Sequence, residues 1–459
     1  MSSNATINPT TGEMVKSFDA HSEAEVEAIL DRAAAANLEL AGTTIAQRAE
    51  WMRAGADLLE GDLDELATVV VTEMGKTKAS AEAEVKKCAT AMRYYADHAA
   101  EFLADEAGFD PSEVNASAAR VVYQPLGTVL AIMPWNFPLW QVIRFAAPGL
   151  MAGNTGVLKH ALNVPQTALY LGDLFARAGF PEGAFQTVLV EGVDATRLIE
   201  DPRIAAVTLT GSVPAGRAVG GTAGGVLKKT VLELGGSDAF IVLPSADLDR
   251  AVQVAVTART QNSGQSCIAA KRFFVHTDIY DAFSGRFVAA MGATVAGDPF
   301  DPDTSFGPLA TEKGRAGVHG LVEDAVAQGA TVLLGGEIPE GPGWFYPATV
   351  VADLTPEMRL FSEECFGPVA ALYRVASLDE AVAMANDSEF GLSSAAFTTD
   401  EDEIEQLTSR LQAGGVFING MTVSFPQLPF GGIKSSGYGR ELSAHGMHEF
   451  CNVKTVWRA

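Results

Sequence analysis

A cysteine that follows a polar, glycine-containing segment is the residue of this chain best suited to covalent chemistry. Cys267 ends the segment NSGQSC at residues 262–267. We expect an apolar helix to follow it, so that backbone N–H dipoles would favour a thiolate relative to a free thiol with a pKa of about 8.5. A buried structural cysteine is the alternative interpretation, and Cys88 and Cys365 suit that role. Cys267 is therefore a candidate nucleophile.

A carboxylate and an amide could complete this chemistry. Glu233 ends an apolar run, 229–234, beside two glycines. Burying an unpaired carboxylate is costly, so its presence there indicates a role, and a general base is the simplest. Asn136 lies between Pro134 and Pro138, which predict a rigid turn. Its side-chain amide could donate a hydrogen bond to a developing oxyanion.

A glycine loop could hold phosphate. The segment GSVPAG, residues 211–216, follows an apolar run and opens a helical segment. Gly211 would allow a ligand close to the backbone, and Ser212 offers a hydroxyl and N–H groups at a helix N-terminus, which suits a pyrophosphate. The usual dinucleotide fingerprint GxGxxG is absent, and a simple capping turn is the alternative. Lys159, at the end of another predicted strand, could reach a cofactor ribose.

The elements that position these residues alternate between strands and helices. The first hundred residues predict helices, including 46–60, 62–73 and 79–104. From residue 127 short apolar runs alternate with amphipathic stretches, which is typical of βαβ units and a parallel sheet. We predict strands at 127–133, 155–159, 186–190, 205–210 and 229–234, and helices at 138–152, 165–178, 194–200 and 214–223. A second series from 239 to 419 includes strands near 239–243, 272–276, 369–375, 393–398 and 415–419, and helices at 247–260 and 400–412.

Two α/β domains that meet near residues 235–236 are therefore expected. The last stretch, 451–457, alternates as a strand, and an exposed terminal strand is usually paired or covered. It could pair with a partner subunit beside residues 108–125, or dock within its own chain.

Composition excludes several classes of protein. The chain has 459 residues, with 32 Lys and Arg against 57 Asp and Glu, and a net charge of −25. Such an acidic chain is a poor match for nucleic acid or an anionic membrane surface. The uncharged run 121–143 contains three prolines, so we predict a buried strand, turn and helix rather than a membrane span. The N-terminus lacks the apolar core of a signal peptide, which favours a cytoplasmic protein. No Cys or His cluster predicts a metal site.

At this point the chain resembles the NAD(P)-dependent aldehyde dehydrogenases. The matching segments, in the family's order, are MPWNFPLW, LTGSVPAG, VLELGGSDAF, NSGQSC, EECFGPV and PFGGIKSSGYGRE. The similarity covers nearly the whole chain. The resemblance implies an α/β fold with a Rossmann-like cofactor domain (1–107 and 126–235) and a catalytic thiol domain (236–432). A small β oligomerisation arm (108–125 and 446–459) would build a homodimer or a dimer of dimers.

The resemblance also implies a mechanism. Cys267 would attack an aldehyde to form a thiohemiacetal, with Asn136 and the Cys267 backbone N–H as oxyanion hole. Hydride would leave to the nicotinamide, and water activated by Glu233 would cleave the thioester. Because relatives that form acyl-CoA do not need this carboxylate, Glu233 favours a free acid as product.

Cofactor residues follow from the same resemblance. Those expected to hold adenosine and phosphates are Trp135, Lys159, Gly211 and Ser212, and those expected near the nicotinamide are Glu364 and Phe366. Relatives that prefer NAD carry a glutamate three residues after the lysine, where this chain has Leu162. Without that carboxylate a 2′-phosphate is not repelled, and Lys159 with His160 could attract it. We therefore expect NADP, with NAD also used.

The substrate is predicted from a narrower similarity, to enzymes that oxidise succinate semialdehyde, on the segments WNFPLWQVIR, LKHA and NGMTVSFPQLPFGG. Arg144 and Ser424 match residues that bind the substrate carboxylate there, and arginine suits a carboxylate. A second arginine of many relatives is replaced by Gln261, with Arg259 two residues away. A surface ion pair is the alternative role for Arg144.

Other functions stay open at this point. Another aldehyde, such as glutarate semialdehyde or an aromatic or aliphatic one, is the nearest alternative. A fold retained for binding without turnover, and a cysteine hydrolase that needs no nicotinamide, are the more distant ones. The breakdown of 4-aminobutyrate would be the usual setting for a succinate-semialdehyde enzyme.

Overall fold

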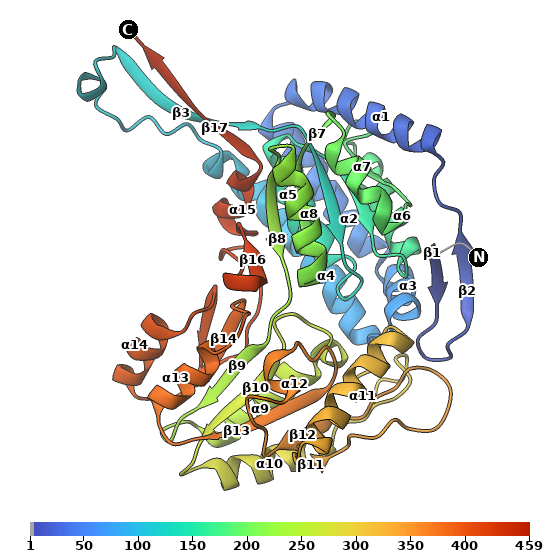
Figure 1. Ribbon diagram of the computed structural model, residues 1–459. Helices are drawn as coiled ribbons and strands as arrows, with labels where there is room; N and C mark the ends of the chain where they lie inside the picture. Colours follow the sequence, from blue (N-terminus) through green and yellow to red (C-terminus); the bar gives the residue numbers. More distant parts are fainter. Residues whose placement is uncertain (1–3) are drawn as a thin grey trace.

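The computed structural model describes residues 4–459, and its body is built on two sheets that lie one above the other in Figure 1. The first sheet has six strands in the order β16-β8-β7-β4-β5-β6. Its strands are β4 (Thr128–Met133), β5 (Thr155–His160), β6 (Phe185–Thr187), β7 (Ile204–Thr210), β8 (Lys229–Glu233) and β16 (Gly437–Tyr438). Only β16 runs antiparallel to its neighbour, β8. Because β5 and β7 both flank β4, the strand order reverses at β4, where such sheets bind ligands beyond their carboxyl ends.

The helices of this half confirm the predicted alternation. They are α5 (Trp140–Ala152), α6 (Pro165–Arg177), α7 (Ala195–Glu200) and α8 (Val213–Gly225), with a short turn η2 (Gly192–Asp194). The strand predicted at 186–190 is shorter than expected and ends at Thr187. The α5 helix continues through Pro148, although proline usually breaks a helix.

The second sheet has seven strands in the order β11-β12-β13-β10-β9-β14-β15, all parallel except β11. Its strands are β9 (Asp238–Val242), β10 (Ala270–His276), β11 (Thr331–Leu334), β12 (Thr349–Ala352), β13 (Val369–Val375), β14 (Ser393–Phe397) and β15 (Gly415–Ile418). Its helices are α9 (Leu248–Thr260), η3 (Gln261–Gly264), α10 (Tyr280–Gly292), α11 (Glu312–Ala327), α12 (Arg359–Ser362), α13 (Leu378–Asn386) and α14 (Glu401–Arg410). The chain passes between the sheets directly from β8 to β9 (Figure 1). The expected two α/β halves are confirmed.

The N-terminal region differs from its prediction. A hairpin of β1 (Asn4–Ile7) and β2 (Met14–Phe18) precedes the helices, with Gly12 at a φ of 75° in its turn. Four helices follow, α1 (Glu23–Ala41), α2 (Ile45–Gly61), α3 (Leu63–Met74) and α4 (Lys78–Phe102). The strands are short, and the turn-forming segment NPTTG was the signal for the hairpin.

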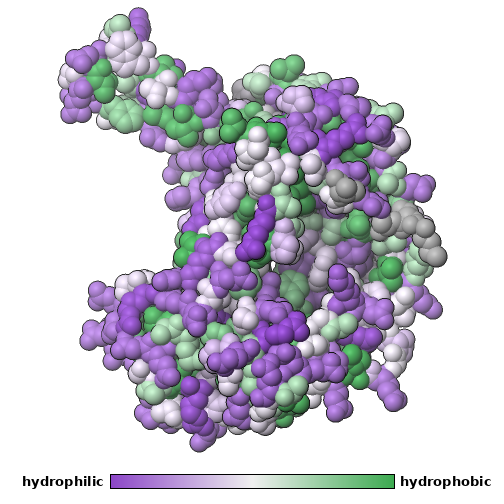
Figure 2. All heavy atoms as spheres, in the orientation of Figure 1, coloured by the Kyte–Doolittle hydropathy of each residue, from purple (hydrophilic) through white to green (hydrophobic). Residues whose placement is uncertain are grey.

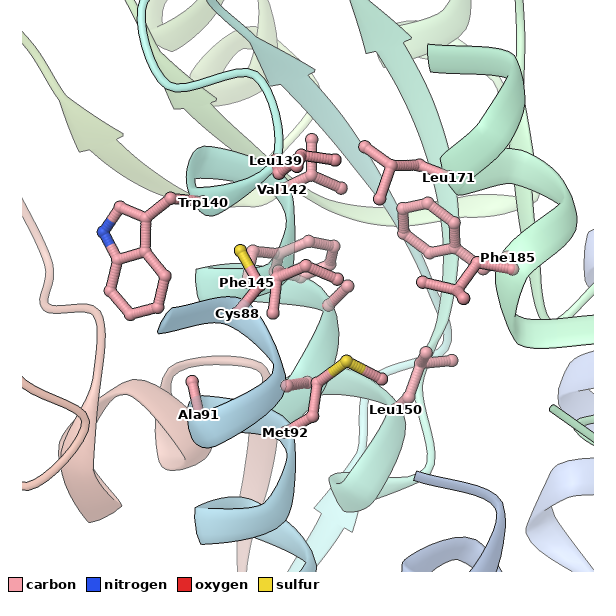
Figure 3. Close-up of a cluster of buried hydrophobic side chains, with 14 of the residues drawn as sticks. Cys88, Ala91, Met92, Leu139, Trp140, Val142, Phe145, Leu150, Leu171 and Phe185 are labelled. Carbon is pink, nitrogen blue, oxygen red and sulfur yellow. The ribbon is translucent and has the colours of Figure 1, made fainter. Parts of the chain in front are cut away.

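An apolar cluster fixes α4 and α5 against the first sheet. Figure 3 shows Cys88 and Met92 of α4 facing Phe145 of α5, with Phe185 of β6 beyond. These side chains are almost completely buried. Trp140, at the start of α5, lies at the edge of this cluster, so its indole nitrogen can face a different environment. The cluster therefore holds the two helices whose polar residues matter below.

The last strand lies within its own chain. After η4 (Lys434–Ser436) and α15 (Ser443–Glu449), β17 (Cys451–Arg458) pairs antiparallel with β3 (Ala118–Pro125), and η1 (Pro111–Val114) lies beside them. The pair forms an arm that projects from the body (Figure 1), and Figure 2 shows apolar atoms on it. Of the two possibilities left open for residues 451–457, pairing within the chain is the one observed.

The uncharged run 121–143 forms the end of β3, β4 and the start of α5. In residues 4–459 no helix combines the length and the apolar character that crossing a membrane requires.

Candidate active site

Cys267 lies where two cavities meet, between the carboxyl edge of the first sheet and the start of β10. The larger cavity, of about 630 Å³ and open to solvent, is lined by Pro134, Trp135, Asn136, Gln141, Thr210, Gly211, Ser212, Leu234, Gly235, Cys267, Glu364 and Phe366. The smaller, of about 420 Å³, is lined by Lys87, Phe137, Trp140, Gln141, Arg144, Gln261, Ser266, Cys267, Ile268, Thr422, Val423, Ser424 and Phe430. We call these the cofactor cavity and the substrate pocket. Cys267 and Gln141 line both.

The backbone around Cys267 differs from the expected helix start. A turn at 267–269 leads directly into β10, so no helix N-terminus acts on the thiol. Burial raises the pKa of Cys267 to about 12, although Lys271 and Arg144 act in the opposite direction. The expectation of a helix whose dipole favours a thiolate is therefore wrong, and burial instead favours the neutral thiol. Its proton must leave when the sulfur attacks.

The loop before Cys267 has an unusual backbone. Asn262 and Ser263 have positive φ angles of 55° and 57°, and Gly264 has a φ of 73°. Non-glycine residues rarely adopt this region, and strain of this kind gathers at functional sites. A Cβ on Gly264 would lie 2.3 Å from the Gly367 carbonyl oxygen, so only glycine fits there.

Arg259 holds this loop in place. It is fully buried, and its guanidinium donates to the carbonyl oxygens of Gly264 (2.6 Å) and Ala270 (2.8 Å). It lines neither the cofactor cavity nor the substrate pocket. Arg259 therefore does not replace the substrate arginine that is missing at Gln261, although Gln261 itself lines the pocket.

Asn136 is held beside Cys267 by the same loop. Its Nδ2 donates to the carbonyl oxygen of Gln265 at 3.2 Å, and Asn262 Nδ2 donates to the Asn136 carbonyl oxygen at 2.8 Å. An amide nitrogen carries two hydrogens, so one is left for an oxyanion. The structure thus brings together the amide and the thiol that the sequence suggested.

A buried ion pair positions the segment that carries Asn136. Glu84 of α4 forms an ion pair with Lys76, and Glu84 Oε1 accepts from the backbone N–H groups of Leu139 and Trp140, each at 2.9 Å. These N–H groups at the start of α5 would otherwise lack partners. Glu84 therefore fixes the turn after Asn136.

Glu233 is not beside Cys267 in this structure. It is 2% exposed at the end of β8, and it lines neither cavity. Its carboxylate lies against Gly431 instead, because a Cβ added to Gly431 would be only 2.7 Å from Glu233 Oε1. Burial and the neighbouring Glu441 raise the pKa of Glu233 well above its usual value, against the opposing charges of Arg144 and Arg440. A role for Glu233 at the thioester requires its side chain to rotate toward Cys267.

Arg144 forms an ion pair, but inside the protein rather than on a helix surface. Its Nε lies against Glu441, Nη2 donates to Thr210 Oγ1 at 3.2 Å, and the guanidinium lies 4.7 Å from the centre of the Phe430 ring. Arg144 and Glu441 are 2% and 4% exposed. Arg144 lines the substrate pocket as expected, yet it already has a carboxylate partner that sequence reasoning missed.

Ser424 joins the same pocket with partners from two helices. Its Oγ accepts hydrogen bonds from Lys87 Nζ at 2.9 Å and from Trp140 Nε1 at 3.0 Å. Lys87 was missed by sequence reasoning. The only signal was its position on α4 between Glu84 and Cys88, which places it at the edge of the buried face.

The cofactor cavity holds most of the residues predicted for it. Gly211 and Ser212 follow β7, and Ser212 Oγ caps α8 by accepting from Ala215 N at 3.4 Å, so the capping interpretation and a place in the cavity are both correct. The Trp135 and Phe366 rings meet edge to face at 5.8 Å.

Glu364 of this cavity is fixed from two sides. It pairs with Lys271 at 3.3 Å and accepts from Gly236 N at 3.1 Å. Aromatic faces, a helix N-terminus and a fixed carboxylate suit the ring, phosphate and ribose groups of a dinucleotide. These residues therefore fit a nicotinamide cofactor.

The histidine expected to attract a cofactor phosphate does not carry charge. His160 is buried, Nε2 donates to the Pro138 carbonyl oxygen at 2.9 Å, and Nδ1 accepts from Ala161 N at 2.9 Å. Burial lowers the pKa of His160 to about 4, so the imidazole is neutral at physiological pH. Lys159 is buried too, and burial lowers its pKa while Asp194 and Glu191 raise it. Any cationic attraction there comes from Lys159 alone.

No cluster of three or more His, Cys, Asp or Glu suited to a metal ion occurs in the part of the chain that the structure describes, residues 4–459. His448 stacks on Tyr123 with ring centres 4.0 Å apart, and its Nε2 donates to the Phe102 carbonyl oxygen at 2.6 Å. These contacts give His448 a structural role.

Comparison with known proteins agrees with this geometry. Residues 2–456 match the model of the Aldehyde dehydrogenase family. The chain is 62% identical to an "Aldehyde dehydrogenase" of Paenarthrobacter nicotinovorans over 453 residues, which cover 99% of each chain. It is 60% identical to "Succinate-semialdehyde dehydrogenase [NADP(+)] 1" of Mycobacterium tuberculosis (strain ATCC 25618 / H37Rv) over 455 residues, again 99% of each. A crystal structure of succinic semialdehyde dehydrogenase from Streptococcus pyogenes in complex with NADP+ superposes with a TM-score of 0.96 at 36% identity, over 99% of both chains. The chain belongs to the aldehyde dehydrogenase family.

Proposed function

We propose that this protein oxidises succinate semialdehyde to succinate and reduces NADP, with NAD as a second cofactor. The observation that carries the proposal is the position of Cys267 between the cofactor cavity and a pocket whose wall includes Arg144 and Ser424. A short aldehyde with a carboxylate at its far end suits this arrangement, because the carbonyl and the anion can contact opposite ends of one pocket. The similarity to the mycobacterial succinate-semialdehyde dehydrogenase [NADP(+)] supports the same substrate and cofactor.

The first step belongs to Cys267 and Asn136. The thiol sulfur attacks the aldehyde carbon as its proton passes to water in the solvent-open cofactor cavity, giving a thiohemiacetal whose oxygen carries the negative charge. Asn136 Nδ2 and the Cys267 backbone N–H donate hydrogen bonds to that oxygen, since a preformed pair of donors stabilises an oxyanion without reorganisation. A bound nicotinamide would supply the acceptor for the hydride of the substrate carbon, which would leave Cys267 carrying a thioester.

Glu233 acts in the second step. After rotating away from Gly431, its carboxylate takes a proton from a water molecule, whose oxygen attacks the thioester carbon; the carbon–sulfur bond breaks, the acid is released and the Cys267 sulfur is regenerated. Glu441 and Arg144 remain behind it as a buried ion pair. This division of roles explains why a carboxylate is kept at the end of β8 despite the cost of burying it.

The cofactor side favours NADP on two grounds. Leu162 leaves no carboxylate to repel a 2′-phosphate, and Lys159 lies at the carboxyl end of β5, the edge of the sheet at which such folds bind dinucleotides. The Streptococcus pyogenes relative, whose structure contains NADP+, supports this choice.

The arm supports an assembly of identical chains. Val453 and Trp457 of β17 are 60% and 51% exposed, and large apolar side chains at such positions commonly mark contact surfaces. We therefore extend the proposal to a homodimer or dimer of dimers built through residues 108–125 and 446–459. The protein would work in the cytoplasm, in the breakdown of 4-aminobutyrate, with residues 1–107 and 126–235 as cofactor domain and 236–432 as catalytic domain.

An absorbance assay at 340 nm with a panel of aldehydes tests the proposal. We expect kcat/KM for succinate semialdehyde to exceed that for butanal and benzaldehyde by at least about ten-fold, a gap of about 1.4 kcal/mol. The assay is run with NADP and NAD in parallel, and NADP should give the lower KM. Equal or better rates on uncharged aldehydes would keep the dehydrogenase but discard this substrate.

A further inference from the structure

Arg144 already forms an ion pair with a carboxylate of the protein. Its Nε faces Glu441, and Glu233 lies close enough to Glu441 for the two carboxyl groups to influence each other. A substrate carboxylate that approached Arg144 would therefore also approach a buried anion of like charge. This repulsion offsets part of the attraction that a free arginine would offer.

Lys87 is the other cation of the substrate pocket, and it has no such partner. In residues 4–459 no carboxylate oxygen lies within 4.0 Å of its Nζ. The nearest anion along α4, Glu84, is already paired with Lys76. Nζ contacts Ser424 Oγ at 2.9 Å and lies 4.1 Å from the centre of the Trp140 ring. A partly buried ammonium group without a counter-ion is costly, and a bound anion would remove that cost.

Ser424 and Lys87 each keep one hydrogen-bond donor that no residue uses among those that the structure describes. Its oxygen accepts from Lys87 Nζ and Trp140 Nε1, which occupies both lone pairs. Its own hydroxyl hydrogen therefore points elsewhere, and it has no acceptor among the described residues 4–459. Lys87 has three hydrogens, of which one binds Ser424 and one faces the indole ring, so a third is free.

Two free donors thus lie side by side, in the pocket that Cys267 lines. A carboxylate has two acceptor oxygens and can take one hydrogen from each donor. A hydroxyl or an uncharged alkyl end would leave the ammonium charge of Lys87 uncompensated.

We propose that Lys87, together with Ser424, binds the carboxylate of the aldehyde substrate, and that Lys87 supplies the charge for which Arg144 is not free. Trp140 orients both groups by donating to Ser424 and by covering the Lys87 ammonium. This inference deepens the proposed function and rests on it, since it requires a substrate with a carboxylate. Lys87 also supplies a cation to a pocket in which Gln261 replaces the second arginine of many relatives.

The test compares Lys87→Met with wild type on pairs of aldehydes that differ only in the carboxylate. The pairs are succinate semialdehyde with butanal, glutarate semialdehyde with pentanal, and 4-carboxybenzaldehyde with benzaldehyde. For the carboxylated aldehyde that wild type prefers, we expect the ratio of kcat/KM over its uncharged partner to fall by about 30-fold in Lys87→Met, mainly through KM. Lys87→Arg, which keeps a cation, should restore most of the ratio.

Lys86→Met is the matched control. Lys86 is the adjacent residue of α4 but is exposed, at 3.9 Å from Glu82, and its replacement should leave the ratio unchanged. A second variant, Lys87→Gln, keeps the test valid if Lys87→Met folds poorly, as judged by its melting temperature.

The outcomes separate the inference from the proposed function. If wild type prefers succinate semialdehyde and Lys87→Met keeps that preference, the inference is wrong and the proposed function stands. If wild type prefers another carboxylated aldehyde and Lys87→Met loses that preference, the inference stands and the substrate is corrected. Equal losses on charged and uncharged aldehydes would show a structural role for Lys87 and overturn the inference, as would a wild type that prefers no carboxylated aldehyde.

Discussion

The two cavities that meet at Cys267 are built in different ways. The cofactor cavity is lined largely by residues that follow strands of the first sheet, such as Trp135 after β4 and Ser212 after β7. Its carboxylate, Glu364, is paired with Lys271. The substrate pocket is lined by side chains from α4, α5 and the segment after β15, and it contains the cations Lys87 and Arg144.

This difference shows that the fold alone gathers the cofactor residues, whereas individual side chains determine the charge of the substrate pocket. Parallel strands bring their carboxyl ends to one edge, so the order of strands is enough to gather the cofactor residues. The charge of the substrate pocket depends instead on which side chains point inward from helices far apart in sequence. We therefore expect changes on the pocket side to alter selectivity, and changes at the shared boundary to stop turnover.

Replacing Cys267, one of the two residues that line both cavities, should have the largest effect. Cys267→Ala removes the nucleophile, so kcat should fall by at least about 10³-fold, while NADP binding is kept because the cofactor cavity is intact. Turnover is measured at 340 nm and binding by titration calorimetry. Cys451→Ala, a buried cysteine at the start of β17, is the control and should retain turnover. Turnover retained in Cys267→Ala would show that the boundary between the cavities is not the reacting centre.

Glu233→Gln should have the next largest effect, although Glu233 lies in neither cavity and must move to act. With the base gone, the thioester forms but is not hydrolysed, so steady-state turnover should fall by about 10²-fold or more. Stopped-flow absorbance at 340 nm should show a burst of about one reduced cofactor per chain, followed by a slow phase. Loss of the burst together with turnover would instead assign Glu233 to the first step.

Glu441→Gln is the matched control for that variant. It keeps the Glu233 carboxylate but removes the neighbouring charge that raises the pKa of Glu233. A base acts when deprotonated, so a lower pKa should move the rise of hydrolysis to lower pH. An unchanged pH profile would mean that the two carboxyl groups do not interact during turnover.

The sequence predicted the cofactor side better than the pocket side, for physical reasons. The alternation of strands and helices placed Gly211, Ser212 and Asn136 at strand ends, because these positions follow from local periodicity. The charge state of His160 could not be predicted, since it is set by the burial of the ring, which depends on how the chain packs around it. The helix expected after Cys267 is a strand, because a short apolar run fits either element.

The pocket side depends on contacts over longer distances along the chain. Lys87 contacts Ser424, which lies 337 residues later in the chain, and no sequence pattern near either residue predicts that contact. The same holds for the partner of Arg144: Glu441 lies in the segment GRE, which alone is typical of an exposed turn. Where tertiary contacts determine the charge of a site, a sequence motif can identify the residue but not its partner.

The smallest expected effect is a pH dependence confined to the pocket side. Burial lowers the pKa of Lys87 to about 8, with Cys88 and Glu84 acting to raise it and Arg144 and Lys76 to lower it. The ammonium form, which binds a carboxylate, is present below this pH and is lost above it. The ratio of kcat/KM for succinate semialdehyde over butanal should therefore fall about four-fold between about pH 7 and about pH 8.5.

Taking a ratio isolates Lys87 from the groups at the cavity boundary. Cys267 and Glu233 serve both aldehydes, so their ionisation cancels, and the substrate carboxylate stays ionised throughout this range. Lys87→Arg should give a high ratio independent of pH, because a guanidinium stays charged, and Lys87→Met a low ratio independent of pH. If the ratio of the wild type instead stays flat while that of Lys87→Met is low, the ammonium remains protonated across the range. The pKa of Lys87 would then be higher than its burial implies. The charge of the substrate pocket would be as independent of pH as that of the cofactor cavity, and the two cavities would differ less.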